Sequence, residues 1–532
     1  MRLDHTKKNG TMILELDRKL QISTFTYDAL DRRILSGYDD GSTTSFTYDT
    51  AGRLTVAEDS GSGRIEFSYD NLDRLVQELT PQGIMQYQYD GIGRRTNMTV
   101  NGQTPVTYQY DSSSRLTQIA QGTQIVGLGY DQAGRRTSLT YPNGVNTNYT
   151  YDTASRLTNI LHEGPSSIIE HLSYTYDAAG NRISFTRTNG SATLLPDAVQ
   201  AAYDAANEQI QFDSTTPNLT YDANGNLTSQ TVASGTTIYT WDSRNRLVAI
   251  SGPGVSASFV YDALGRGITK TINGETTGFQ YDGNDIVSEE NGAAVTVTYL
   301  RSLNIDEPFI RQGSSDEFYH VDALGSSVVL TDSSGAIDTF YEYEAFGETT
   351  VNGPSTNPFQ YTGRENDGRG LYYYRARHYS PTYKRFMGED PLEFGGRDVN
   401  LYSYVFNNPI NLVDPTGKAI IAPMPKHCLP ESGRKDSRLK GFFRDIACDP
   451  ANIIPGVGMV RGPTQGMIRN FEQQLAKHGK KSLEKALRSL EKRLGEHLEK
   501  LSNLDYRGVV EREIRNFEAQ IEAIKQVLGR QQ

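Results

Sequence analysis

Hydrophobic and polar residues alternate along most of the chain. In Ser45-Phe46-Thr47-Tyr48 and in residues 85–89 (MQYQY), every second side chain is aromatic or apolar. This period of two places the apolar side chains on one face of an extended strand and the polar ones on the other. An isolated hairpin of such strands is barely stable in water. The pattern therefore predicts a mostly β fold in which successive hairpins pair edge to edge in one long, coiled sheet.

The dipeptide Tyr-Asp marks the repeating unit of this pattern. It begins at residues 27, 48, 69, 89, 110, 130, 151, 176, 203, 221, 261 and 281, and Trp241-Asp242 fills the gap in the series. Most steps are 20 or 21 residues long, so the chain contains an internal repeat that tolerates insertions. We expect two strands of about eight residues in each repeat.

The residues after each Tyr-Asp, as in YDTAGRL and YDQAGRR, have the composition of a hairpin turn. Asp at the first turn position can accept hydrogen bonds from the following backbone, and Gly at the fourth adopts the left-handed conformation. A second turn with Gly, such as Asp40-Gly41 or Asn143-Gly144, lies near the middle of the repeat. Packing of the tyrosines across neighbouring strands explains their recurrence, and stacking of a carbohydrate on them is the alternative.

The composition agrees with a chain of short strands and turns. It contains 50 Gly and 32 Tyr against a single Trp, which favours turns and half-buried strands over long helices. Cys428 and Cys448 make neither a disulfide framework nor a zinc-ligand pattern, so neither a metal nor another cofactor is predicted. The N-terminal residues lack the apolar run of a signal peptide, and no window of the chain predicts a membrane-spanning helix.

Charge divides the chain in two. Residues 418–532 carry 22 Lys and Arg against 14 Asp and Glu, a net charge of +8, which leaves −19 for residues 1–417 of a total of −11. Pro and Gly are frequent over 418–465, which predicts an irregular lead-in. Over 466–532, apolar residues recur every three or four positions with a break near Ser502, which predicts an antiparallel helical hairpin.

From about residue 20 to 417, with its YD repeats and the later segment GLYYYRARHYSP, the chain resembles the Rhs, or YD-repeat, proteins of bacteria. These are related to the teneurin YD shell and to the C component of insecticidal toxin complexes. The resemblance implies a hollow β-cocoon, followed by a C-terminal domain that is often a toxin. It implies four parts: YD repeats forming a β-shell over 1–298, an Rhs-associated core with a shell plug over 299–417, the lead-in over 418–465 and a variable α-helical domain over 466–532.

Two Asp-Pro motifs close the core, Asp390-Pro391-Leu392-Glu393 and Asp414-Pro415-Thr416-Gly417. In the family, a pair of DPxG motifs looks like an aspartyl peptidase that cuts its own chain just after the second motif. Such chemistry needs two neighbouring carboxyls, one taking a proton from water and the other giving one to the amide. The resemblance therefore implies Asp390 and Asp414 as the catalytic pair. The structural alternative is that Asp before Pro is a common turn or helix-cap residue.

The sequence departs from the family motif at two positions next to the expected cut. Glu393 stands where the first motif usually has Gly, and Lys418 stands where Leu usually precedes the cut. Either change is able to abolish self-cleavage. Where cleavage does occur, it is expected to release a fragment that begins near residue 418 or 419.

The segment between the repeats and the second motif predicts supporting elements. Residues 371–379 (LYYYRARHY) predict a strand with aromatic side chains on one face and Arg375 and Arg377 on the other. These arginines are expected either to pair with carboxylates of the shell or with the two motif aspartates, or to be solvated or in ordinary structural pairs, which is the commoner case. Residues 399–405 are expected to form a short buried helical turn.

Together these features predict an encapsulation and delivery protein whose shell holds a C-terminal effector. The expected partners are the chain's own C-terminal domain inside the shell, a cognate immunity protein and a secretion apparatus. Nucleic-acid binding by basic helix faces, with Lys477 and Arg493 among them, is a weaker alternative because interleaved Glu residues also fit an ordinary surface helix. The protein is expected to be secreted, or delivered into a target cell, without a signal peptide in this chain. The alternative function is a structural or adhesive surface protein with an oligomerising helical tail and no catalysis.

Overall fold

A computed structural model describes residues 12–190, 199–292, 294–368, 370–396 and 398–421. All of them belong to the first of two units into which the chain divides, residues 1–453 and 454–532. The helical hairpin predicted over 466–532 and nearly all of the predicted lead-in lie outside the described residues.

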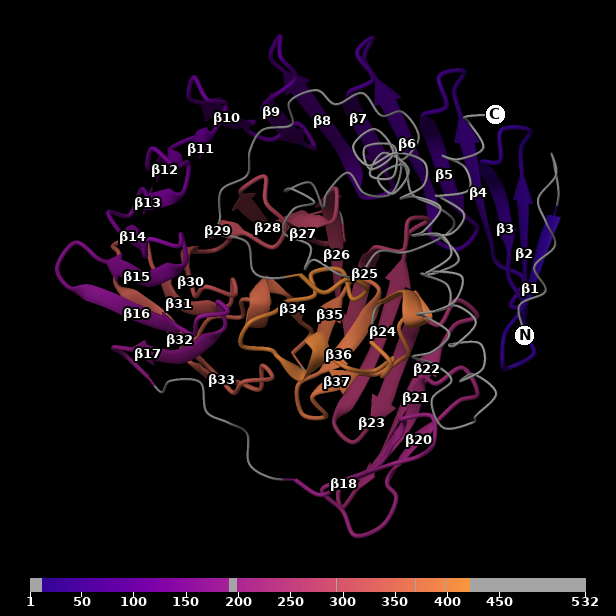
Figure 1. The fold of residues 1–532 in the computed structure, drawn as a ribbon. Coiled ribbons are helices and arrows are strands. Elements are labelled where there is room, and N and C mark those ends of the chain that lie inside the picture. The colour runs from indigo at the N-terminus through magenta and orange to yellow at the C-terminus, as the bar shows by residue number, and fades with distance from the viewer. Residues whose placement is uncertain (1–11, 191–198, 293, 369, 397, 422–532) are drawn as a thin grey trace, which may run out of the picture. The chain divides into compact units, whose positions relative to one another are not determined.

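The first sheet has 17 strands within the described residues, and each strand pairs antiparallel with the next along the chain. Consecutive hairpins follow one another along a curved sheet, coloured indigo to magenta in Figure 1. The strands are β1 (Met12–Leu16), β2 (Ile22–Tyr27), β3 (Arg33–Gly37), β4 (Thr43–Tyr48), β5 (Leu54–Asp59), β6 (Gly63–Tyr69), β7 (Leu75–Thr80), β8 (Gly83–Tyr89), β9 (Arg95–Val100), β10 (Val106–Tyr110), β11 (Leu116–Gln121), β12 (Gln124–Tyr130), β13 (Arg136–Thr140), β14 (Asn146–Tyr151), β15 (Leu157–Glu163), β16 (Ile168–Tyr176) and β17 (Arg182–Arg187).

A second sheet of 14 described strands continues the same hairpin pattern, after the separate pair β18 (Ala201–Tyr203) and β19 (Gln209–Phe212). Its strands are β20 (Leu219–Tyr221), β21 (Leu227–Val232), β22 (Gly235–Trp241), β23 (Leu247–Gly252), β24 (Val255–Tyr261), β25 (Gly267–Ile272), β26 (Glu275–Asp282), β27 (Asp285–Asn291), β28 (Ala294–Arg301), β29 (Pro308–Gln312), β30 (Asp316–Val321), β31 (Ser327–Thr331), β32 (Ile337–Tyr343) and β33 (Thr349–Asn352). The domain boundaries stay predictions, although residue 298 lies inside β28 and the sheet runs on to Asn352. Both sheets confirm the mostly β fold, but the hairpins form two large sheets and not the single one predicted, because the pairing between successive strands is interrupted on both sides of β18–β19.

The turns have the predicted chemistry, as the repeat around Asp49 shows. The Asp49 carboxylate accepts hydrogen bonds from the amides of Ala51 and Arg53, both at 2.9 Å, and Gly52 has φ +83°. The turn occupies the five residues from Asp49 to Arg53, which lie between β4 and β5. For this reason most strands have five to seven residues and are shorter than the eight expected.

The tyrosines and arginines of neighbouring repeats lock together, a role that the sequence did not predict. The Arg53 guanidinium lies 4.8 Å from the centre of the Tyr69 ring in the next repeat and donates to the carbonyl of Asp70 at 3.1 Å. The Tyr69 hydroxyl in turn donates to the carbonyl of Leu54 at 2.7 Å. The same ring contact recurs for Arg32, Arg74, Arg94, Arg115, Arg135 and Arg156. Each of these repeats is therefore joined to the following one by a cation–π contact, and at Arg53 and Tyr69 by two hydrogen bonds as well.

This lock is interrupted where the first sheet ends. At three successive turns, Asn181, Glu208 and Asn226 stand in place of the arginine. The turns belong to the strands from β16 to β21, which include the separate pair β18–β19. The lock resumes with Arg246, which lies 4.8 Å from the Tyr261 ring.

The two large sheets share one apolar core. Side chains of β8 to β16, such as Met85 and Leu172, cluster with side chains of β27 to β31, such as Phe309 and Val329. Buried ion pairs cross between the sheets, including Arg266 with Glu78 at 2.7 Å and Arg136 with Glu307 at 2.6 Å. Because an unpaired buried charge is costly, these pairs fix how the two sheets meet.

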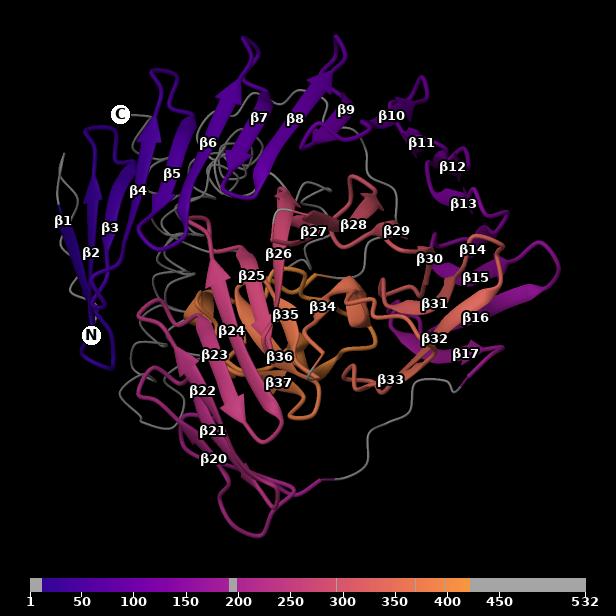
Figure 2. The ribbon, with the colours of Figure 1, turned by 180° about the vertical axis from the view of Figure 1, so that it is seen from behind.

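A four-stranded sheet packs against the second large sheet, beside β23 to β26 in both views of the molecule (Figures 1 and 2). Its strands are β34 (Glu365–Asn366), β35 (Tyr372–Tyr374), β36 (Arg377–Ser380) and β37 (Arg385–Phe386), and the short 3-10 helices nearby are η1 (Tyr361–Gly363), η2 (Glu393–Gly396) and η3 (Val405–Asn407). The Tyr373 hydroxyl donates to the carbonyl of Gly265 at 3.2 Å, and that of Tyr402 to the carbonyl of Gly225 at 2.9 Å. These contacts hold the core sheet against the shell strands.

Two local predictions for this core were wrong. Residues 371–379 form a hairpin and not one strand, because Arg375 adopts a left-handed conformation (φ 58°) that reverses the chain after β35. The helical turn expected over 399–405 begins only at Val405, since the preceding residues form turns and an isolated bridge. In the part of the chain described here, no helix is long and apolar enough to span a membrane.

Candidate functional site

Arg377 brings the two motif aspartates together. One of its terminal nitrogens, Nη2, lies 3.0 Å from Asp390 Oδ2 and 3.5 Å from Asp414 Oδ2. The two carboxylate oxygens therefore cannot be farther apart than the sum of these distances. The structure thus places Asp390 and Asp414 at one site, and the expected pairing of Arg377 with them is confirmed.

The site is buried, which changes its proton affinity. The Asp414 side chain is 1% exposed and that of Asp390 is 10% exposed. Burial raises the pKa of both carboxyls above the usual 3.8, although the nearby Arg377 guanidinium opposes the shift. Each carboxyl is close to the other, and the charge of Asp414 adds to the rise for Asp390. The pair is therefore suited to hold one shared proton.

The second motif forms a loop around the Asp414 carboxylate. Its Oδ1 accepts hydrogen bonds from the amide of Lys418 at 3.1 Å and from that of Ala419 at 3.0 Å. The carbonyl of Gly417 accepts a hydrogen bond from Arg377 Nε at 2.5 Å. In the peptide bond between Gly417 and Lys418, the carbonyl oxygen thus accepts a hydrogen bond from the Arg377 guanidinium, and the N–H donates one to the Asp414 carboxylate.

Gly417 is required for this arrangement. It has φ +67°, and a Cβ at this position would lie 2.4 Å from the carbonyl oxygen of Tyr374. Because neither this backbone conformation nor this contact tolerates a side chain, the loop can approach the β35–β36 turn only with Gly here.

A small cavity borders the Asp390 carboxyl. Its volume of about 10 Å³ corresponds to the space of roughly one water molecule. It is lined by Arg377, Asp390, Glu393, Gly396, Asp398, Asn400, Leu401, Ser403 and Ile420. The Ser403 hydroxyl in this wall is buried and has no hydrogen-bond partner in the described part of the chain. The cavity therefore offers polar groups that would hold a water molecule beside Asp390.

The departure from the family motif at Glu393 is visible in the backbone. Glu393 has φ 50°, a left-handed conformation that suits Gly and strains other residues. Its amide nevertheless donates to the carbonyl of Asp390 at 2.7 Å and closes the turn that follows the first Asp-Pro. The turn is therefore formed despite the substitution.

Arg375 forms its ion pairs with carboxylates other than Asp390 and Asp414. It pairs with Asp306 at 2.7 Å and Asp285 at 3.1 Å, both in the second large sheet or its loops. This confirms the expected pairing of an arginine of this segment with carboxylates of the shell.

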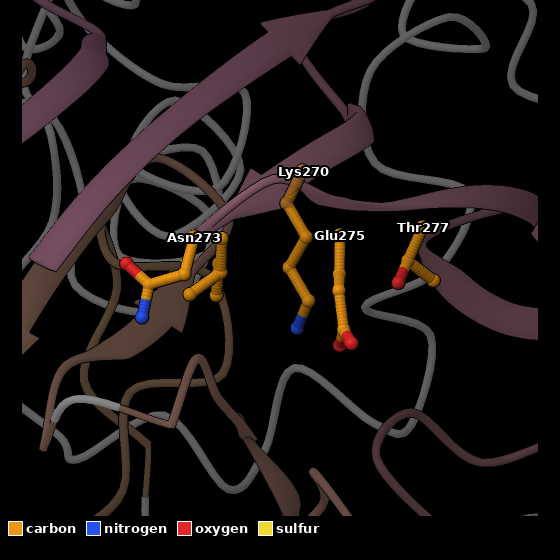
Figure 3. Close-up of a pocket in the computed structure, with 5 residues that line it drawn as sticks. Lys270, Asn273, Glu275 and Thr277 are labelled. Atoms are coloured by element: carbon orange, nitrogen blue, oxygen red, sulfur yellow. The ribbon is translucent and has the colours of Figure 1, made fainter.

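A larger hollow of about 470 Å³ lies over β25 and β26, where Lys270, Asn273, Glu275 and Thr277 project from one hairpin (Figure 3). The Lys270 ammonium is paired with Glu365 at 2.7 Å. Within the described residues, no group of three or more His, Cys, Asp or Glu side chains is arranged to hold a metal ion.

The repeated hairpins and the core sheet packed on them define a YD-repeat shell protein. The chain belongs to the teneurin YD-shell family, whose model matches residues 18–146 and 144–410. It is thus an Rhs or YD-repeat protein, as the sequence resemblance indicated.

Individual relatives cover shorter stretches. The tRNA3(Ser)-specific nuclease WapA of Bacillus spizizenii is 29% identical over 260 residues, which are 46% of this chain and 11% of that protein. The toxin subunit YenC1 of Yersinia entomophaga is 39% identical over 103 residues, which are 18% of this chain and 10% of that protein. The crystal structure of TcdB2-TccC3 matches 74% of this chain and 28% of that chain, with a TM-score of 0.56 and 19% identity, a likeness of fold. The chain thus spans about a tenth of the length of these curated relatives.

Proposed function

We propose that this chain is an encapsulation and delivery protein whose YD-repeat shell holds a C-terminal effector. Its family membership and its likeness to a toxin subunit and to a nuclease that acts on tRNA support this function. Its partners would be its own C-terminal domain, a cognate immunity protein and a secretion apparatus. The protein would act outside the producing cell or inside a target cell.

We further propose that the chain cuts itself after the second Asp-Pro motif. Asp390 takes a proton from a water molecule in the adjoining cavity, and the water oxygen forms a bond to the carbonyl carbon. Arg377 stabilises the negative charge that develops on the carbonyl oxygen, because it already donates to the oxygen of Gly417. Asp414 gives its proton to the leaving nitrogen as the C–N bond breaks. The products are a carboxyl end on the shell and an amino end on the C-terminal fragment.

The contacts favour the bond between Gly417 and Lys418. Its carbonyl oxygen contacts Arg377 and its nitrogen lies 3.1 Å from Asp414. The nitrogen of Ala419, at 3.0 Å from the same carboxyl, makes the next bond the second candidate. Sequencing of the amino end of the released fragment distinguishes the two, since it begins either with Lys418 or with Ala419.

The observation that carries the self-cleavage proposal is that one guanidinium contacts both carboxylates and the carbonyl that precedes the bond. The test is the intact mass of freshly synthesised protein followed over time. We expect two fragments from the wild type and one full-length chain from Asp414→Asn and from Asp390→Asn. The matched control is Asp31→Asn in an exposed repeat turn, which should be cut as the wild type is. A wild-type chain that stays intact would overturn self-cleavage and favour the structural or adhesive function.

A further inference from the structure

Arg375 lies in the β35–β36 turn, next to the loop of residues 414–419 that carries the bond proposed to be cut. None of its hydrogen bonds or ion pairs in the described structure is with Asp390 or Asp414. Its side chain is 13% exposed, and all five of its N–H groups donate hydrogen bonds to other acceptors. Nε donates to the carbonyl of Asn284 at 3.1 Å, and Nη2 to Asp306 at 2.7 Å and to Asp285 at 3.1 Å. Nη1 donates to Asp306 at 3.2 Å and to the carbonyl of Pro415 in the second motif.

The acceptors on the shell side are themselves firmly held. Asp285 begins β27 and also pairs with Arg301 at 3.2 Å. Asp306 lies between β28 and β29, is 8% exposed and also pairs with Arg364. The buried carboxylate of Asp306 and the 18% exposed carboxylate of Asp285 thus lie among three arginines, and such a network is costly to break because one partner would be left charged without its counterion. Arg375 therefore has a fixed position only where β27 to β29 are in place.

On the other side, the β35–β36 turn holds three consecutive carbonyls of the second motif. Arg375 contacts the oxygen of Pro415, the amide of Ala376 donates to that of Thr416 at 3.2 Å, and Arg377 contacts that of Gly417. The first of these contacts directly follows Asp414, and the last precedes the bond proposed to be cut. A shift of this loop by about 1 Å is enough to slow a reaction by roughly two orders of magnitude.

We propose that Arg375 is a positioning residue that makes self-cleavage depend on the assembled shell. The inference rests on the self-cleavage proposed above. Because Arg375 bonds Asp285 and Asp306 on one side and the carbonyl of Pro415 on the other, the position of β27 to β29 determines where the loop that carries Asp414 lies. A chain whose second sheet has not yet formed lacks this alignment, so the bond is cut only after the shell strands are in place.

The first test measures the rate of cleavage in protein made by cell-free synthesis with a short pulse of label. We expect Arg375→Gln and Asp306→Asn each to slow cleavage by about 10- to 100-fold. Arg375→Lys should recover part of the rate, because it keeps the charge but cannot reach all the acceptors at once. In the double variant the two effects should not multiply, since both break the same connection. The control is Arg187→Gln, a similarly buried arginine paired with Glu170, which should be cut at about the wild-type rate.

The second test does not need cleavage and therefore separates this inference from the proposed function. In an Asp390→Asn background, hydrogen exchange of residues 414–421 is compared with and without Arg375→Gln. We expect faster exchange at the amides of Lys418 and Ala419 with Arg375→Gln and unchanged exchange with Arg187→Gln. An intact wild type would overturn self-cleavage alone, and this exchange result would then decide the positioning role. The role of Arg375 would be overturned if the wild type is cut and Arg375→Gln changes neither the cleavage rate nor the hydrogen exchange of residues 414–421. If Arg375→Gln does not fold, Arg375→Lys is used for the same comparison.

Discussion

Arg377 and Asp390 form a buried ion pair, with Nη2 3.0 Å from Oδ2, and the same nitrogen reaches Asp414. Removing the guanidinium leaves two neighbouring carboxyls without their cation and the Gly417 carbonyl without its donor. We expect Arg377→Gln to stop self-cleavage and to destabilise the protein by about 3 kcal/mol at neutral pH. Intact mass and urea unfolding measure the two effects. The loss of stability should shrink at acidic pH, where the carboxyls are protonated, and an equal loss at both pH values would contradict the pairing.

The pH dependence of cleavage follows from the raised pKa values of Asp390 and Asp414. The pair must hold one proton, so the rate should rise as the first carboxyl ionises and fall as the second does. Because burial raises the pKa of both groups above 3.8, both limbs should lie at a pH above 3.8. Cleavage of newly synthesised chains in a series of buffers tests this. A rate that increases steadily toward alkaline pH would show that no shared proton is needed.

The left-handed backbone at Glu393 gives a prediction of opposite sign. Glu393→Gly removes the strain of φ 50° and restores the residue that the family motif has there. We expect a gain of roughly 1 kcal/mol in the free energy of unfolding, partly offset by the greater freedom of Gly in the unfolded chain. Self-cleavage should persist. Ile420→Gly in the same cavity wall has no such strain to relieve, and equal gains from both changes would exclude the conformational explanation.

The lock between repeats predicts the cost of losing one tyrosine hydroxyl. Tyr89 donates to the carbonyl of Leu75 at 2.7 Å, while Arg74 lies 4.9 Å from the ring centre. Tyr89→Phe keeps the ring but leaves that carbonyl without this donor, so we expect a loss of about 1–2 kcal/mol in thermal or urea unfolding. Tyr203→Phe, at a residue that is 54% exposed, should cost less than about 0.5 kcal/mol. Similar losses at both sites would count against the lock.

The buried pair of Arg136 and Glu307 predicts a strong coupling between the two large sheets. Their side chains are 2% and 4% exposed, and two hydrogen bonds of 2.6 and 3.3 Å join them. Arg136→Met alone should destabilise the protein by about 3–5 kcal/mol because Glu307 is left charged and buried. Adding Glu307→Gln removes that charge and should restore most of the loss. The measurement is a double-mutant cycle in urea, and additive effects would show that the two residues are not coupled.

The repeat and its turns could be predicted from the sequence because their determinants are local. Asp49 and Gly52 lie within one turn, and the strand period of two is visible in any few residues. The tyrosine–arginine lock was missed because Arg53 contacts Tyr69, sixteen positions later. A signal was present, since an arginine recurs five residues after most of the repeated tyrosines, as Arg53 follows Tyr48.

The sequence alone determined a mostly β chain of YD hairpins and a pair of aspartates next to prolines. Only the tertiary structure decided that residues 371–379 turn back at Arg375, because a left-handed arginine carries no local signal. That reversal sends Arg375 to the shell carboxylates and Arg377 to Asp390 and Asp414, residues up to 90 positions away in the chain. Such distant contacts depend on how the sheets pack and on which buried charges must be paired, and no local pattern encodes them.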